Sequence, residues 1–358
     1  MVETENFVLQ WLAWEITSRC NLSCIHCRSQ AGADAGGGEF STAQAAALID
    51  DIASFSKPVL VLSGGEPLLR PDIFELAGHG ASRGLRMALA SNGALISDGI
   101  CGRIKASGIR IVSLSLDGST SAVHDDFRRQ PGAFNATLAA AGALRRHGID
   151  FIVNSSFTRR NQADIPEVYR LAKSLGARAW YLFMVLPTGR AEALREELIG
   201  PQDYEEILGW HYRMEKDESE MLVRPICAPH YYRLALQKSR AEGLSWKRRS
   251  LSFSTGGAKG CVCGQSIAFI SAQGEVQPCS YFPTSAGNVK ERAFSEIWRH
   301  SELLRSLRDF SRYKGRCGAC EYIKVCGGCR ARAELYGGDY LGEEPLCSHK
   351  PERKRGEA

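Results

Sequence analysis

Thirteen cysteines are the most informative residues in this chain of 358 amino acids. Three of them, Cys20, Cys24 and Cys27, follow an apolar segment near the N-terminus with the spacing C-x3-C-x2-C. Thiolates are soft ligands that suit iron–sulfur clusters and zinc. A four-iron cluster held by three cysteines keeps one iron without a protein ligand, and that iron is open to a further molecule. The alternatives are a zinc site completed by His26 and three unrelated buried thiols.

A second group of nine cysteines lies toward the C-terminus: Cys227, Cys261, Cys263, Cys279, Cys317, Cys320, Cys326, Cys329 and Cys347. Zinc ribbons usually separate their two C-x2-C pairs by about 15–20 residues. Here only five residues separate the pair at Cys317 and Cys320 from the pair at Cys326 and Cys329. Compact runs of this kind favour iron–sulfur clusters. Cys101 stands alone and is expected to be a small buried apolar side chain.

Composition excludes several classes of protein. Hydrophobic residues make up 44%, charged residues make up 24%, and the formal net charge is +5, which are ordinary values for a globular protein without a nucleic-acid partner. No run of about 18 apolar residues exists, so no membrane span is expected. The acidic N-terminus does not resemble a secretory signal, which predicts a cytoplasmic protein whose cysteines bind metal and do not form disulfides.

The elements that must position these cysteines alternate between strand-like and helix-like patterns. Six apolar segments read as strands: 12–17, 59–63, 85–90, 111–116, 151–156 and 180–186. Helical patterns at 42–55, after Asp72 and at 134–147 fit between them, and the intervals match βαβ crossovers that give a parallel sheet. The sequence therefore predicts an α/β fold, either a partial barrel or an open curved sheet, with its ligands at the carboxyl ends of the strands.

Beyond residue 200 the pattern changes, which predicts three regions: 1–200, a helical and loop connector at 201–259, and a cysteine-rich region at 260–358. A helix is expected from Pro201 to about Lys216, and a loop from Lys238 to Lys259. In the last region we expect a hairpin over 267–276 and one amphipathic helix over 295–310.

Motifs at the predicted strand ends carry a family resemblance. They read Gly-Gly-Glu-Pro at 64–67, Ser-Asn-Gly at 91–93 and Ser-Leu-Asp-Gly at 115–118. With Cys20, Cys24 and Cys27 they resemble the radical S-adenosylmethionine (SAM) superfamily over about residues 9–190. The resemblance implies a partial (βα)6 barrel, a [4Fe–4S] cluster on the three cysteines and SAM on its open iron. It further implies a 5′-deoxyadenosyl radical as the oxidant and a reduced flavodoxin or ferredoxin as the electron donor.

The same resemblance assigns roles to individual residues. Gly64 and Gly65 let the backbone approach SAM closely, and Glu66, followed by Pro67, is expected to accept hydrogen bonds from the SAM ammonium group. His26 stands where the family stacks an aromatic ring near adenine. Four polar residues are expected either to reach the ribose or carboxylate or to be ordinary strand ends: Asn92, Ser115, Asn154 and Ser155.

Residues 260–350 resemble the SPASM extension, which implies one or two auxiliary [4Fe–4S] clusters. One cluster is expected on Cys317, Cys320, Cys326 and Cys347. The other is expected on Cys261, Cys279 and Cys329, with Cys263 or Cys227 as its fourth ligand. The chain departs from that family in one respect, because its last cysteine pair is C-x2-C where C-x3-C is usual.

Segments 13–17, 186–190 and 227–233 resemble the branch of the family that forms haem b and haem d1. This implies a tetrapyrrole substrate and oxidative decarboxylation of two propionates of iron-coproporphyrin III to vinyl groups. Arg190, Arg224 and Arg233 are expected to pair with propionates, and His230 to approach the iron, unless these side chains are structural. The alternatives are a haem-d1-type modification, a SPASM peptide modifier and an iron–sulfur electron carrier. We expect a minimal catalytic chain without a leader-binding domain.

Overall fold

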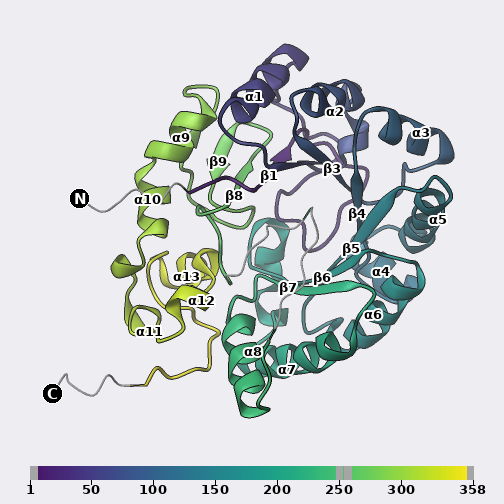
Figure 1. The fold of residues 1–358 in the computed structure, drawn as a ribbon. Helices are drawn as coiled ribbons and strands as arrows, with labels where there is room; N and C mark the ends of the chain where they lie inside the picture. Colours follow the sequence, from purple (N-terminus) through teal and green to yellow (C-terminus); the bar gives the residue numbers. More distant parts are fainter. Residues whose placement is uncertain (1–6, 247–252, 254–259, 353–358) are drawn as a thin grey trace.

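The structure, a computed structural model, describes residues 7–246, 253 and 260–352. One ten-stranded sheet in the order β10-β9-β8-β1-β2-β3-β4-β5-β6-β7 curves through the molecule, with helices on its outer side (Figure 1). The strands are β1 Trp11–Glu15, β2 Val59–Ser63, β3 Arg86–Ser91, β4 Ile111–Ser115, β5 Asp150–Phe157, β6 Ala179–Met184, β7 Leu222–Ile226, β8 Ile267–Ile270, β9 Glu275–Gln277 and β10 Gly287–Asn288.

Helices connect the strands and continue into the C-terminal region. The α-helices are α1 Thr42–Phe55, α2 Ile73–Ser82, α3 Asp98–Ala106, α4 Ser121–Arg128, α5 Ala133–Arg146, α6 Ile165–Ser174, α7 Pro201–Asp217, α8 His230–Ala241, α9 Phe294–His300, α10 Glu302–Arg308, α11 Gly315–Gly318, α12 Ile323–Cys326 and α13 Arg330–Gly337. The 3-10 helices are η1 Pro67–Leu69, η2 Gln162–Asp164, η3 Gly189–Glu197 and η4 Phe310–Arg312.

The predicted α/β class and its parallel sheet are confirmed. All six predicted strands are present, and β1 to β6 pair in parallel in chain order. Local signals also behave as expected: Ser41 forms a capping box at the start of α1, and α5 ends just before Gly148, whose φ is +63°. The hairpin β8–β9 forms as predicted, with Gly274 in its turn.

Some predictions were wrong in detail. Residues 222–226 in the expected connector form β7, which pairs in parallel with β6, and β8 pairs in parallel with β1. The sheet therefore runs through all three predicted regions, whose boundaries stay a prediction. Helix α8 continues through Ala241, so the expected loop begins later, and residues 247–252 and 254–259 of it lie outside the described residues. The helix expected over 295–310 is two helices separated at Ser301.

Alternation along the strands explains how the barrel holds a cavity. The outward side chains, such as Leu12, Trp14 and Leu62, are large and pack against the helices in the main core. The inward side chains form a separate apolar cluster in which large residues such as Phe269 alternate with small ones such as Ala13 and Ala88. Small inward residues leave space inside the curve of the sheet.

Among the described helices, none combines the length and the apolar character needed to cross a bilayer.

Candidate active site

The loop from Thr17 to Gly32, here called the cluster loop, begins just after β1 and carries Cys20, Cys24 and Cys27 to the carboxyl end of the sheet. All three residues line a cavity of about 300 Å³ inside the barrel, here called the barrel cavity. Burial raises the pKa of the Cys20 thiol to about 11, because the thiolate is poorly solvated there. A bound metal cation would supply the positive charge that this buried thiolate lacks.

Gly64 and Gly65 at the end of β2 hold the cluster loop by close backbone packing. A Cβ atom on Gly64 would lie 2.3 Å from the carbonyl oxygen of Thr17, and one on Gly65 would lie 2.2 Å from that of Arg19. The Gly65 amide donates to the Thr17 carbonyl at 2.8 Å, and the Glu66 amide donates to the Arg19 carbonyl at 2.8 Å. The two glycines therefore let β2 approach the cluster loop itself, a role that the sequence did not indicate.

Arg190 holds the same loop from the other side. Its Nε donates to the carbonyl of Cys24 at 2.7 Å, and its Nη1 donates to the carbonyl of Ala31 at 2.9 Å. Its backbone amide donates to the carbonyl of Cys27 at 2.9 Å. Arg190 lines the barrel cavity, and these three bonds position the cluster loop. Its pairing with a propionate stays a prediction.

A buried charged group that the sequence analysis missed lies beside Cys24. The Nη1 of Arg128 lies 3.7 Å from the Cys24 sulfur, and its Nη2 forms an ion pair with Asp117 at 2.6 Å. His26 stacks on Phe127, with ring centroids 4.4 Å apart, and its Nε2 lies 3.7 Å from Asp117. Burial holds the pKa of His26 well below its usual range, so its imidazole is neutral. The sequence carries no local signal for this group, because the burial of Arg128 at the end of α4 is visible only in the folded chain.

Glu66 follows β2 and is held by hydrogen bonds from three donors of the chain. It is fully buried, and its carboxylate accepts hydrogen bonds from Ser91 Oγ at 2.9 Å, from the amide of Asn92 at 2.8 Å and from the amide of Leu68 at 3.2 Å. Burial raises the pKa of this carboxyl to about 7, and the three donors oppose that shift. Its contacts therefore fasten the end of β3 to the turn that Pro67 begins. Its expected hydrogen bond with the SAM ammonium group stays a prediction.

Polar residues at the strand ends line the barrel cavity. Asn92, Ser115 and Asn154 are among them, and the buried Oδ1 of Asn154 has no hydrogen-bond partner within the described chain. Ser155 points away from the cavity and accepts a hydrogen bond from Trp180 Nε1 at 2.9 Å. Strand alternation puts Ser156 in the cavity instead, which corrects the expectation for Ser155. An unpartnered buried acceptor beside three thiols fits a polar cofactor such as SAM.

Five thiols gather around a second cavity of about 200 Å³ that adjoins the barrel cavity, and we call them the five-thiol site: Cys227, Cys261, Cys263, Cys279 and Cys329. The two cavities share Trp11, Tyr181, Phe183 and Tyr281 as wall residues. Of the residues expected to bind substrate, Arg224 lines this second cavity. Together the two adjoining cavities extend from the cluster loop to the C-terminal cysteines.

Four further thiols line a separate small cavity and form the four-thiol site: Cys317, Cys320, Cys326 and Cys347. Backbone amides of Glu344, Tyr322 and Gly328 lie 3.3–3.4 Å from the sulfurs of Cys317, Cys320 and Cys326. Amide donors aimed at sulfur stabilise thiolates, which is the form that binds iron. The cluster loop, the five-thiol site and the four-thiol site thus each supply the thiolates that a [4Fe–4S] cluster needs. The cluster loop supplies three of them, and each of the other two sites supplies at least four.

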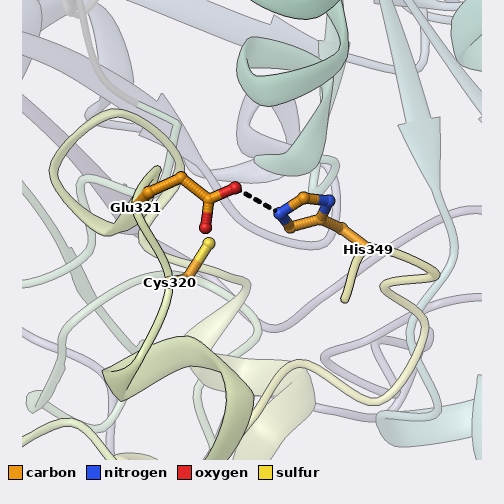
Figure 2. Close-up of side chains that lie close together, drawn as sticks. All are labelled: Cys320, Glu321 and His349. Atoms are coloured by element: carbon orange, nitrogen blue, oxygen red, sulfur yellow. Dashed lines mark hydrogen bonds and ion pairs between the residues drawn. The ribbon is translucent and has the colours of Figure 1, made fainter. Parts of the chain in front are cut away.

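Figure 2 shows the exposed edge of the four-thiol site, where His349 Nε2 lies 2.8 Å from Glu321 Oε1. The ligand atoms of Cys320, Glu321 and His349 lie within 4.8 Å of one another. Its only soft ligand, Cys320, also lines the cavity of the other three thiols. These three residues therefore belong to the edge of the four-thiol site and do not form a separate metal site.

Two of the expected substrate residues lie away from both cavities of the barrel. Arg233 pairs with Glu205 and lines the cavity of the four-thiol site. His230 is fully buried against the Tyr204 ring, with centroids 4.7 Å apart, and its nitrogens have no hydrogen-bond partner among the described residues.

Cys101 is buried in the main core, as expected for a small apolar side chain.

Comparison with known proteins agrees with this geometry. Residues 14–172 match the model of the radical SAM superfamily, and residues 261–330 match the SPASM iron–sulfur cluster-binding domain. The AdoMet-dependent heme synthase of Methanosarcina barkeri is 45% identical over 96% of this chain and 97% of that protein. The pre-heme d1 synthase of Dinoroseobacter shibae is 32% identical over 93% of this chain and 85% of that protein.

Among solved structures, Streptococcus suis SuiB bound to S-adenosylmethionine has the same fold. Its TM-score is 0.73 at 15% sequence identity, covering 96% of this chain and 78% of that one. The relatives, the domain matches and the three thiol sites agree on one family. The chain belongs to the radical SAM superfamily, and it is a radical SAM enzyme with a C-terminal SPASM domain that uses [4Fe–4S] clusters and SAM.

Proposed function

We propose that this enzyme modifies a tetrapyrrole, and specifically that it converts iron-coproporphyrin III into haem b by oxidative decarboxylation of two propionates. The observation that carries this proposal is the adjoining pair of cavities between the cluster loop and the five-thiol site. The name of the Methanosarcina barkeri relative, a heme synthase 45% identical to this chain, supports the choice of substrate class.

The walls of the second cavity suit a flat apolar ring with charged edges. Pro225, Ile226 and Val262 contribute apolar surface, and Tyr181 and Tyr232 contribute aromatic surface. Arg224 is the cation on this wall, and a guanidinium pairs well with a carboxylate. Arg28, which the sequence analysis missed, lines the barrel cavity over the Phe269 ring, where it pairs with Glu15 at 3.0 Å.

The reaction needs both ends of this space. Each propionate would lose one hydrogen atom from the carbon β to its carboxylate, then CO₂, and finally one electron, which leaves a vinyl group. When bound, the cluster and SAM supply hydrogen-atom abstraction at one end, and an auxiliary cluster supplies electron acceptance at the other. The chain's own residues hold the cluster loop, pair with the carboxylates and exclude water from the abstraction site.

The substrate is tested directly with anaerobic, reduced protein, SAM and iron-coproporphyrin III. We expect two successive mass losses, each of one CO₂ and two hydrogens, together with 5′-deoxyadenosine. The matched control is Cys24→Ala, which should give neither product. Protein that forms 5′-deoxyadenosine but leaves the porphyrin mass unchanged would contradict the substrate and not the radical chemistry.

A second candidate is a haem-d1-type modification, which the 32% identity to the Dinoroseobacter shibae relative favours. The mass of the product distinguishes the two candidates. A reduced electron donor of the flavodoxin or ferredoxin type is part of the proposal in both cases.

A further inference from the structure

The five-thiol site holds one cysteine more than a four-iron cluster binds. The sulfur atoms of Cys261 and Cys263 lie 3.4 Å apart, which is contact distance for two sulfurs. In a four-iron cluster, each cysteine binds a different iron, and the four thiolates point to the corners of a tetrahedron around the core. Two sulfurs in contact are too close together to bind two different irons of the cluster, so in this arrangement Cys261 and Cys263 present one ligand position between them.

The remaining corners must come from the other thiols around this cavity. Cys279 and Cys329 line it from the C-terminal region. Cys227 lines it from the other side, between β7 and α8 of the barrel, and lies upstream of the segment that matches the SPASM model. Together with one thiol of the close pair, these three residues make a set of four.

The backbone at Cys227 is held in a conformation that a non-glycine residue rarely adopts. Its φ angle is +59°, in the left-handed region. Its carbonyl oxygen accepts hydrogen bonds from Tyr204 Oη at 2.7 Å and from Arg332 Nη2 at 2.6 Å. Strain of this kind persists where surrounding contacts impose it, and it is concentrated at functional sites.

One buried ion pair connects Cys227 to Cys329. Arg332 Nη1 lies 3.0 Å from Glu344 Oε1, and both side chains are 1% exposed. Glu344 Oε2 accepts a hydrogen bond from the backbone amide of Cys329 at 2.8 Å. A buried ion pair is costly to desolvate, so its position between two thiol-bearing segments indicates that it fixes them relative to each other.

We infer that Cys227 is a ligand of the auxiliary cluster, together with Cys279, Cys329 and one interchangeable thiol of the Cys261–Cys263 pair. The barrel thus supplies one corner of a cluster that otherwise belongs to the SPASM domain. Each ligating thiol loses its proton to solvent as its sulfur binds iron. This inference concerns the metal site, and it holds whichever substrate the enzyme accepts.

The test measures iron, sulfide and electron paramagnetic resonance spectra of anaerobic protein. The background is the full chain with Cys20→Ala, Cys24→Ala and Cys27→Ala, so that the cluster loop adds no iron. In this background we expect Cys227→Ala and the double variant C261A/C263A to lose about four irons per chain or to convert the cluster to a three-iron form. The single variants C261A and C263A should keep their iron, because the neighbouring thiol takes over, and C101A is the matched control.

Full iron and an unchanged spectrum in Cys227→Ala would overturn the assignment. Loss of iron in C261A or in C263A alone would overturn the shared corner. Cys227→Ser keeps the size of the side chain and serves if the alanine variant is poorly folded, with circular dichroism as the check. A folded serine variant with full iron and the spectrum of its parent would likewise overturn the inference.

Discussion

The cluster loop and the five-thiol site hold their cysteines in opposite ways. The cluster loop carries three thiols between Cys20 and Cys27 on one continuous segment. The five-thiol site draws its thiols from separate segments, and Cys227 and Cys329 are 102 residues apart along the chain. The first is fastened by backbone contacts to Gly65 and Arg190, and the second by the buried pair of Arg332 and Glu344.

The difference follows from what each site must do. Three ligands on one loop leave an iron open, but the loop needs tight packing to hold them in place. A site with four or more thiols from distant segments closes around its cluster and links the parts of the chain that supply it. The two sites should therefore fail separately when their own supports are removed.

The largest effect is expected from Cys24→Ala. Loss of one of three ligands should abolish SAM cleavage and remove about four irons per chain, while the C-terminal iron stays. Liquid chromatography of 5′-deoxyadenosine and an iron assay check this result, with Cys101→Ala as the control. Substantial SAM cleavage by the variant would show that the cluster loop is not the SAM site.

Arg332→Gln should destabilise the five-thiol site and leave the cluster loop intact. It leaves the Glu344 charge buried without its partner, which costs about 3–5 kcal/mol. Anaerobic denaturation measures the loss, and iron analysis should show that it falls on the C-terminal sites. The matched control is Lys314→Gln, which removes an exposed pair with Asp339 and should change stability far less. Equal effects of the two variants would contradict a special role for the buried pair.

Gly65→Ala tests the packing of the cluster loop. Its Cβ would lie 2.2 Å from the Arg19 carbonyl oxygen and 2.9 Å from Cys20 Cβ, so the loop must shift, at a cost of about 1–3 kcal/mol. We expect reduced iron at this site and a lower midpoint of thermal unfolding. Gly102→Ala in α3 meets no atom within 4 Å and should be neutral or stabilising. Unchanged iron in the Gly65 variant would mean that the loop adjusts freely.

The smallest effect is expected from Arg190→Lys. Lysine keeps the charge but not the planar pair of donors to Cys24 and Ala31, so the rate of SAM cleavage should fall about tenfold, corresponding to about 1.4 kcal/mol. Porphyrin binding, followed by absorbance, should stay nearly unchanged. Arg195→Lys, in an exposed pair with Glu192, is the control. Loss of porphyrin binding with normal SAM cleavage would contradict the positioning role and support the predicted substrate role of Arg190.

Several parts of the molecule follow from local sequence alone. The strands β1 to β6, the capping box at Ser41 and the spacing of the cluster loop depend on residues that are neighbours in the chain. β7 was missed because it contains Pro225, which argues against a strand in the sequence and is tolerated here because β7 is an edge strand.

The roles of Glu66, Ser155 and Arg190 required the tertiary structure. Ser155 lies on β5, where alternation along the strand sets the direction of its side chain. Glu66 and Arg190 lie outside the strands, and their contacts depend on which distant segments pack against them. The sequence determined by itself that three cysteines form one local set, because covalent spacing holds them close. Only the folded chain decided that Cys227 joins Cys279 and Cys329, since no local rule brings together residues that distant segments carry to one cavity.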